Sequence, residues 1–283
     1  MEALTASAVR SFLSPDAAGF FRIRTEACVP STNAALKALA RENGPAGAVL
    51  IAEAQTAGVG RLGRSFFSPQ KTGLYLSVLF RPALSAEDVR YLTPCAAVCA
   101  AESIEGIAPT VSARIKWVND IYIEEKKAAG ILTEAAFSGA GLSWAVIGIG
   151  IDLCPPEDGF PPELSDTAGT VFSEAPEEDV RPRLAGELLS RLYRRVSALP
   201  ERSFLDDYCR RSLLDGRRVT VLKESVNTVN GLPALALGIT EDCGLAVRYD
   251  DGREEVLSSG EVAHAPISVR FQSFTGNSEK ERA

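Results

Sequence analysis

A loop rich in glycine and arginine, set between two apolar segments, limits the possible folds of this chain more than any other feature. The loop, residues 52–69, contains three glycines and two arginines: Gly58, Gly60, Gly63, Arg61 and Arg64. Glycine adopts positive φ and lets a backbone approach a ligand closely, and arginine offers a permanent charge with a planar fork of donors. The pattern predicts a loop between two strands that folds over an anionic group such as a phosphate. A flexible, solvated hairpin loop is the plainer interpretation of the same residues.

Residues 58–63 also match G-x-G-x-x-G, the fingerprint of dinucleotide binding. That fingerprint needs a preceding strand, a helix that opens on the glycines, and an acid about 20 residues further on. Only the strand is present here, because Pro69, Gly73 and a second apolar segment follow the loop. The sequence therefore argues against a Rossmann nucleotide fold.

Composition excludes several classes of protein. The chain has 283 residues, is 46% hydrophobic and carries a net charge of −7. This length allows one large or two smaller domains, and the negative charge argues against general affinity for nucleic acid. No apolar run approaches the length of a membrane span, and the N-terminus lacks the pattern of a signal peptide. We therefore expect a cytoplasmic protein without nucleic-acid or membrane partners.

The number and spacing of the cysteines and the single histidine argue against further classes of site. The six cysteines include no C-x-x-C pair, so free core thiols are expected rather than a disulfide framework. A single histidine, His264, argues against His-based metal sites and Ser-His-Asp catalysis. Residues 1–19 cannot hold a helix-turn-helix domain, so no DNA-binding module is expected before the core.

The order of predicted elements indicates an α+β fold. Strands are expected at 20–26, 47–53, 74–80, 113–118, 121–124, 128–137 and 142–153, and helices at 34–41, 93–106, 175–199 and 203–214. Ser31 or Thr32 would cap the first helix, and Thr93 the second. A mixed, mainly antiparallel sheet with helices on one face fits this order. Short strands and turn signals after Asp215, among them Asn230-Gly231, predict a small β-barrel over 215–269, followed by a disordered tail at 270–283.

Two further polar motifs complete a candidate site. Residues 116–120 (KWVND) place a lysine, an amide and a carboxylate beside an aromatic ring, and Lys127 opens the apolar segment 128–132. Together with Arg61 and Arg64 they can form a cationic pocket that contains one acid. Such a pocket suits phosphoryl or nucleotidyl transfer. The alternative is that both lysines are solvated turn residues.

Taken together, the motifs resemble those of the biotin–protein ligases. The family's STN, GRGRxGRxWxSP, KWPND, (R)KxAGIL, GIGINV and closing GEV have counterparts in residues 31–33, 58–69, 116–120, 126–132, 148–153 and 260–262. The resemblance implies a class II synthetase-like catalytic domain at 1–214 and an SH3-like barrel at 215–269. It implies that biotin reacts with ATP, in the presence of Mg²⁺, to give biotinyl-adenylate and pyrophosphate. A lysine of a biotin carboxyl carrier protein then takes up the biotin. Without a DNA-binding domain, ligase activity alone is expected, and the oligomeric state stays open.

The resemblance also assigns roles to single residues. Lys127 would bind the carboxylate and α-phosphate, Arg61 would close over the ligand with its loop, and Asp120 would align the adenylate and the incoming lysine. No residue is assigned to a metal. Contacts with biotin or ATP are expected from Ser31, Thr32, Asn33, Gln55, Gly58, Gly60, Arg61, Gly63, Arg64, Phe66, Lys116, Trp117, Asn119, Lys127, Gly130, Ile131, Gly150 and Asp152.

Three positions depart from the family pattern. Val59 replaces the first loop arginine and Phe66 replaces the tryptophan, so altered ligand retention is expected rather than loss of activity. Asp152 replaces the asparagine of GIGINV, and a carboxylate accepts from the adenine amino group but cannot donate, so nucleotide affinity or selectivity should change. The departures leave open a non-catalytic biotin-binding relative. The fold shared with lipoate–protein ligases leaves that activity open too, although the absence of a histidine near the loop argues against it.

Overall fold

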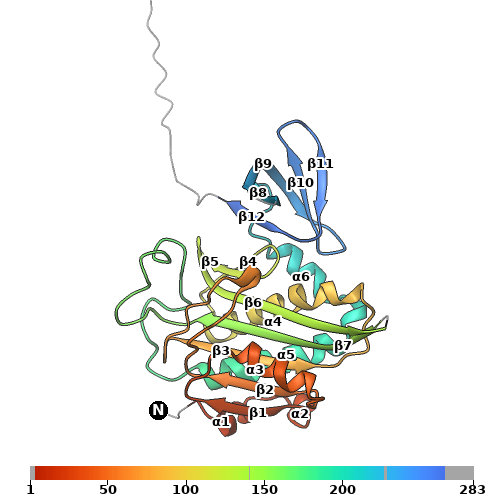
Figure 1. The fold of residues 1–283 in the computed structure, drawn as a ribbon. Coiled ribbons are helices and arrows are strands. Elements are labelled where there is room, and N and C mark those ends of the chain that lie inside the picture. Colours follow the sequence, from red (N-terminus) through yellow and green to blue (C-terminus); the bar gives the residue numbers. More distant parts are fainter. Residues whose placement is uncertain (1–3, 140, 226–227, 265–283) are drawn as a thin grey trace, which may run out of the picture.

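A seven-stranded sheet of order β1-β2-β3-β7-β6-β5-β4 forms the larger part of the molecule (Figure 1). The structure is a computed structural model that describes residues 4–139, 141–225 and 228–264. Strands β1 and β2 are parallel, and the other neighbouring pairs are antiparallel, which confirms the predicted mainly antiparallel sheet. The strands are β1 (Arg22–Glu26), β2 (Ala48–Ala52), β3 (Gly73–Phe80), β4 (Ala113–Lys116), β5 (Asp120–Ile123), β6 (Lys126–Ser138) and β7 (Gly141–Asp152).

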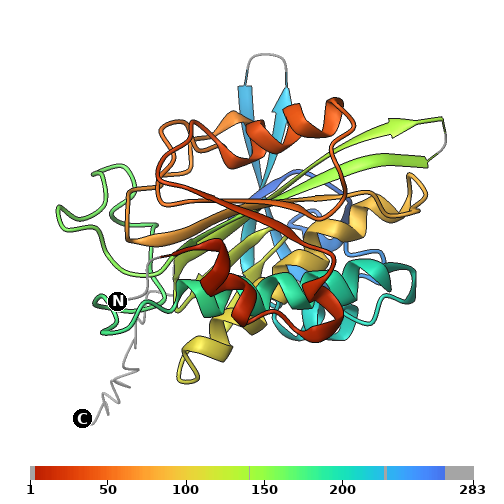
Figure 2. The same cartoon turned by 90° about the horizontal axis from the view of Figure 1, so that it is seen from below.

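Helices cover both faces of this sheet, so the prediction of helices on one face is wrong. Helix α3 (Thr32–Arg41) packs on the face opposite to α1 (Ala6–Ser11), α4 (Leu92–Ile107) and α5 (Arg181–Ser197) (Figure 2). Alternate residues of a strand face opposite sides. Leu50 of β2 and Val146 of β7 therefore pack with Leu36 of α3, while their neighbours Val49 and Ile147 join the larger core around α4.

The helix boundaries correct two predictions. Ser31 is the N-cap of α3, as predicted, and its hydroxyl accepts the Ala34 N–H at 3.3 Å. Thr93 does not cap α4, because the helix begins at Leu92 and the Thr93 hydroxyl donates to Thr133 Oγ1 at 2.8 Å. The helix predicted at 175–199 begins only at Arg181. The remaining short elements are α2 (Pro15–Ala18), α6 (Leu205–Arg210), η1 (Arg61–Gly63), η2 (Asp88–Tyr91) and η3 (Leu199–Glu201).

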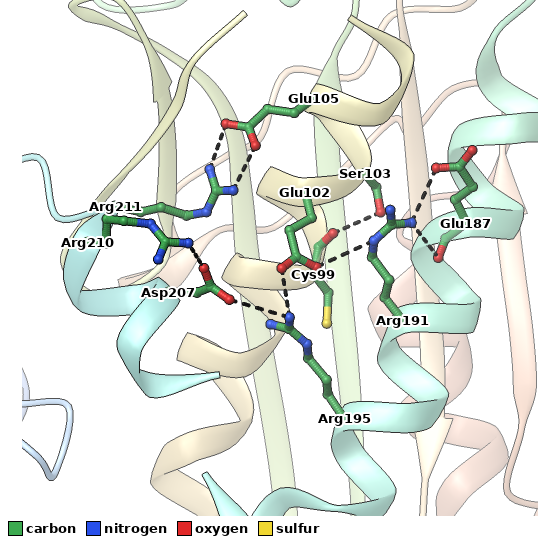
Figure 3. A network of polar contacts seen from close by, with 10 residues as sticks. All are labelled: Cys99, Glu102, Ser103, Glu105, Glu187, Arg191, Arg195, Asp207, Arg210 and Arg211. Carbon is green, nitrogen blue, oxygen red and sulfur yellow. Dashed lines mark hydrogen bonds and ion pairs between the residues drawn. The ribbon is translucent and has the colours of Figure 1, made fainter. Parts of the chain in front are cut away.

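A network of ion pairs joins α4, α5 and the segment around α6 (Figure 3). Arg195 of α5 contacts Glu102 of α4 at 2.7 Å and Asp207 of α6 at 3.7 Å. Arg211, just after α6, binds both oxygens of Glu105 at 2.6 and 2.7 Å. The paired side chains are largely buried, so the network orients three helices that pack behind the sheet.

A second, antiparallel sheet of order β11-β10-β9-β8-β12 follows and confirms the predicted small β domain. Its strands are β8 (Arg218–Ser225), β9 (Thr228–Ile239), β10 (Leu245–Tyr249), β11 (Glu254–Leu257) and β12 (Glu261–His264). The turn predicted at Asn230-Gly231 is wrong, because both residues belong to β9. The domain limits 1–214 and 215–269 remain a prediction, and the predicted tail at 270–283 lies outside the described residues.

The cysteines agree with the expectation of free thiols rather than a disulfide framework. All six cysteines are free thiols, and four of them are buried. Within the described ranges, no helix combines the length and the apolar character that a bilayer crossing requires.

Candidate active site

Three glycines form the floor of a groove on the α3 face of the large sheet. Gly148 and Gly150 of β7 share one face, and Gly130 of β6 lies opposite Gly150. A side chain at Gly148 or Gly150 would collide with the walls. A Cβ at Gly148 would lie 2.0 Å from Asn33 Oδ1, and a Cβ at Gly150 would lie 2.5 Å from a ring carbon of Phe66. The groove thus exists because glycine occupies this stretch of two adjacent strands. The prediction included Gly130 and Gly150 but missed Gly148, although its spacing from Gly150 places both on one strand face.

Polar side chains close one end of the groove. Gln55 Oε1 accepts from the Thr32 N–H at 2.9 Å and from the Thr32 hydroxyl at 3.1 Å, and Gln55 Nε2 donates to Ser68 Oγ at 3.0 Å. The Ser77 hydroxyl lies 2.7 Å from Thr32 Oγ1 and 2.5 Å from Asn33 Oδ1. These groups hold one another in place and present donors and acceptors to a small polar ligand.

Ser77 was absent from the prediction although it organises this end of the groove. It is fully buried on β3. A signal was available, because Ser77 is the polar residue within the otherwise apolar segment GLYLSVLF. Buried hydroxyls need partners, and those of Ser77 are the two α3 residues that line the groove, Thr32 and Asn33.

The glycine-arginine loop lines the groove, and its two arginines bond to residues outside the loop. Arg61 donates to Asn119 Oδ1 at 2.9 Å and to the Gly260 carbonyl at 3.1 Å. Arg64 forms a bidentate ion pair with Glu261, the first residue of β12. The loop therefore spans from the large sheet to the small β domain, and both arginines line the cavity beneath it.

Gly58 and Gly63 shape this loop and do not line the cavities. At Gly58 a Cβ would lie only 2.4 Å from the Phe66 carbonyl oxygen. Gly63 has φ +73°, the left-handed region, in the turn that carries Arg61. Neither glycine lines the groove or the cavity beneath the loop, so the predicted ligand contacts of Gly58 and Gly63 stay predictions.

Lys127, on β6, lines the same groove as Arg61. Lys127 Nζ lies 2.8 Å from Asp120 Oδ1, and about a third of the lysine side chain (34%) is exposed. Asn119 Nδ2 donates to Asp120 Oδ1 at 2.9 Å and to the Ile131 carbonyl at 3.1 Å. Arg61, the Asn119 amide and the ion pair of Lys127 with Asp120 therefore lie next to one another.

Next to the groove lies a wider, charged cavity of about 310 Å³. Four cationic side chains line it, together with the two carboxylates Asp120 and Glu261; the cations are Arg61, Arg64, Lys116 and Lys127. Burial lowers the pKa of Lys116, while the two carboxylates oppose this shift. An excess of positive charge in a recessed site attracts anions such as phosphates.

Trp117 lines this charged cavity but also connects the two sheets. Its indole N–H donates to the Cys243 carbonyl, in the turn before β10, at 2.8 Å. The side chain is buried and belongs to the main core. These contacts support a structural role for Trp117, in addition to any contact with a ligand.

Comparison with known proteins agrees with this geometry. The model of the biotin/lipoate A/B protein ligase family matches residues 26–152. A biotin--[acetyl-CoA-carboxylase] ligase of Mycobacterium tuberculosis is 30% identical over 250 residues, which make up 87% of this chain and 90% of that protein. The fold is similar to that of a biotin protein ligase from Aquifex aeolicus in complex with biotin and ATP, with a TM-score of 0.69 and 27% identity. That match covers 87% of this chain and 99% of the other.

A bifunctional ligase/repressor BirA of Bacillus spizizenii is 38% identical over 152 residues, 54% of this chain. The match covers 46% of that protein, so the chain spans about half the length of this relative. The region that the family model matches, residues 26–152, contains the groove and the glycine-arginine loop.

Proposed function

Because the chain belongs to the biotin/lipoate A/B protein ligase family, we propose that it is a biotin–protein ligase. It would activate biotin with ATP and transfer it to a lysine of a biotin carboxyl carrier protein in the cytoplasm. One observation carries this proposal: a glycine-floored groove leads from a closed polar end to a cationic cavity, with Lys127 where the two meet. The names of the relatives, a biotin--[acetyl-CoA-carboxylase] ligase and a biotin protein ligase with biotin and ATP, support the same assignment.

The polar end of the groove suits the neutral ureido head of biotin. An amide-like group buried without partners costs about 1–3 kcal/mol. Thr32, Asn33 and Gln55 supply both donors and acceptors there. Thr32 and Gln55 hydrogen-bond each other, and the Ser77 hydroxyl holds Asn33. Biotin would lie along the glycine floor with its carboxylate toward Lys127.

Lys127 and Arg61 would then stabilise the charge that develops during activation. A carboxylate oxygen of biotin attacks the α-phosphorus, the bond between the α- and β-phosphates breaks, and pyrophosphate leaves with the electron pair. Lys127 and Arg61 both line the groove and the adjoining cationic cavity, so both can contact the α-phosphate region. The leaving pyrophosphate would occupy the cationic cavity beside them.

In the second step, the amine of the carrier lysine attacks the acyl carbon, an amide forms and AMP leaves. The amine loses a proton, and Asp120 is the carboxylate next to Lys127 that can accept it. Until the carrier arrives, the loop that holds Arg61 would shield the anhydride from water.

The residues at the site also fit Mg²⁺ in the way this ion usually binds. Mg²⁺ keeps several waters and is held by one or two carboxylates together with substrate phosphates. Among the described residues no cluster of three or more metal-ligating side chains exists, whereas Asp120 lines the cationic cavity. Asp120 would thus contact an ion carried in with the nucleotide, which supplies charge neutralisation for the phosphates.

Mass spectrometry of a biotin carboxyl carrier domain tests the proposal. We expect the domain to gain one biotinyl group when incubated with this protein, biotin and MgATP. A carrier with its acceptor lysine replaced by arginine is the matched control and should stay unmodified. Biotin binding without release of pyrophosphate would instead indicate a non-catalytic relative. Modification with lipoate in place of biotin would indicate a lipoate–protein ligase.

A further inference from the structure

The side-chain amide of Asn33 is held in one orientation by partners on β6 and β3. Its Nδ2 atom donates to the Leu132 carbonyl at 3.3 Å and to a carboxylate oxygen of Glu134 at 3.0 Å. The Ser77 hydroxyl lies 2.5 Å from Asn33 Oδ1. An amide oxygen carries no proton, so Ser77 is the donor in this hydrogen bond. Both N–H groups of the amide and one lone pair of its oxygen are therefore used.

A half-turn of this amide would place acceptors against one another. Asn33 Oδ1 would then face the Leu132 carbonyl and the Glu134 carboxylate, and neither group has a proton to donate. Asn33 is only 5% exposed, and a buried oxygen without a donor is strongly disfavoured. Of the two acceptors, only the one on Glu134 belongs to a side chain, so a substitution can remove it.

This orientation presents the Asn33 oxygen to the groove. Asn33 lines the groove, and its Oδ1 would lie 2.0 Å from a Cβ built on Gly148, whereas its Nδ2 would lie 3.0 Å away. An amide oxygen has two lone pairs. Ser77 occupies one of them, which leaves the second for a ligand that lies on the glycine floor. The group of a ureido head that matches this acceptor is an N–H.

Glu134 acts from outside the groove. It follows Gly130 and Leu132 on the same face of β6, but it is not among the described residues that line the groove or the charged cavity. Its second carboxylate oxygen lies 2.5 Å from Lys37 Nζ, and the two side chains are 30% and 26% exposed. Glu134 thus binds two residues of α3, Asn33 and Lys37, that are one helical turn apart. Its charge also polarises the Asn33 amide, which makes the amide oxygen a stronger acceptor.

We propose that Glu134 is a positioning residue for biotin and that it acts through Asn33. Glu134 holds the amide nitrogen, and the amide oxygen therefore stays toward the groove as the acceptor for a ureido N–H. A ligand that carries an acceptor at this position meets the amide oxygen and is rejected. The ion pair of Lys37 with Glu134 is then part of ligand selection, although neither residue contacts the ligand. This inference rests on the proposed function.

The test uses ligands that differ from biotin in one ureido group. In two cyclic carbamate analogues of biotin, a ring oxygen replaces one or the other ureido N–H. We would measure Kd for biotin and for both analogues by calorimetry, without ATP. The wild type should bind one analogue about tenfold or more weakly than biotin, because the ring oxygen of that analogue faces Asn33 Oδ1.

In Glu134→Leu the Asn33 amide is free to turn and offer a donor. The same analogue should then bind within about threefold of biotin, since both amide orientations are populated. Glu134→Gln keeps an acceptor for Asn33 Nδ2 and should retain the wild-type ratio of Kd values. A merely structural role of Glu134 would weaken the binding of all three ligands alike. An unchanged ratio in Glu134→Leu would therefore overturn the proposal.

A charge swap tests the same role without removing the ion pair. Lys37→Glu combined with Glu134→Lys keeps opposite charges on α3 and β6 but places a donor beside the Asn33 amide. The swap should reverse the ratio, so that the analogue binds more tightly than biotin; the wild-type ratio in this variant would also refute the role of Glu134.

Glu26→Leu is the matched control. It removes a glutamate of similar exposure, 33%, whose ion pair with Arg24 also spans 2.5 Å. Glu26 lies on β1 of the same sheet and is not among the described residues that line the groove. Its loss should leave all three Kd values unchanged.

Pyrophosphate release separates this inference from the proposed function. If the wild type binds biotin but releases no pyrophosphate with MgATP, the ligase proposal fails, while the Kd ratios still decide the role of Glu134. If pyrophosphate is released and Glu134→Leu keeps the wild-type ratio, the ligase proposal stands and the role of Glu134 is refuted. In the active enzyme, Glu134→Leu should raise KM for biotin and leave kcat within about twofold, because Asn33 would hold the head of biotin and not its carboxylate.

Discussion

Replacement of Lys127 by methionine should separate catalysis from stability. The ion pair with Asp120 spans 2.8 Å, and its side chains are 34% and 20% exposed. Partly solvated pairs of this kind contribute at most about 1 kcal/mol. Asp120 keeps the hydrogen bond from Asn119 Nδ2 at 2.9 Å, and methionine retains the apolar stem. The free energy of unfolding should therefore fall by no more than about 1 kcal/mol.

The effect on the reaction should be far larger. A single well-placed donor at a developing charge is worth about 3–4 kcal/mol, or roughly 10²–10³ in kcat. Lys127→Met should therefore slow biotin-dependent pyrophosphate release by about that factor at saturating ATP. Urea unfolding of the same preparation measures the stability change.

Lys126→Met is the matched control. Lys126 is the preceding residue, is exposed, and donates to the Ser165 carbonyl at 3.1 Å. Its loss should leave turnover within about twofold of the wild type, since a surface contact of this kind contributes little. If the rate of pyrophosphate release by Lys127→Met stayed within tenfold of the wild-type rate, Lys127 would not be a catalytic residue. If it unfolded along with losing activity, the assignment of its role to charge stabilisation would be wrong.

Three further outcomes follow from the contacts described. Gly148→Ala brings a Cβ to 2.0 Å from Asn33 Oδ1 and should weaken biotin binding, measured by calorimetry, at least tenfold, while circular dichroism stays unchanged. Arg211→Met leaves Glu105 without its bidentate partner (Figure 3) and should lower the free energy of unfolding at pH 7 by about 1–3 kcal/mol. Burial would raise the pKa of Glu105, but hydrogen bonds from Arg211 and the Ala113 N–H outweigh it and lower the pKa below the ordinary 4.5. The stabilisation is then complete above pH 4.5 and fades as pH falls through the lowered value, so urea curves of wild type and Arg211→Met should converge in acid; a gap that stays constant to pH 2 would contradict this origin.

The glycine-arginine loop shows what local sequence can predict. Strand periodicity on both sides of the loop, and the conformational freedom of its glycines, depend on residues close together in the chain. The prediction of two strands joined by a loop that carries Arg61 and Arg64 was therefore correct. The same holds for the Ser31 cap, because a capping hydroxyl acts within its own helical turn.

Contacts between residues far apart in the chain could not be predicted from local sequence patterns. Glu261 pairs with Arg64 across 197 positions of the chain, and no local pattern indicates that β12 holds the loop. The prediction that all helices cover one face was wrong, because the side that α3 covers depends on how β2, β3 and β7 align their alternate residues.

The amino-acid sequence by itself determined the strands, the polar motifs and their order, since each depends on the chemistry of neighbouring residues. Only the tertiary structure decided that Gly130 faces Gly150 across two strands, and that Asp152 ends their groove inside an aromatic cavity. The physical reason is strand register: the pairing of strands that are distant in sequence determines which residues share a face and which groups lose contact with water.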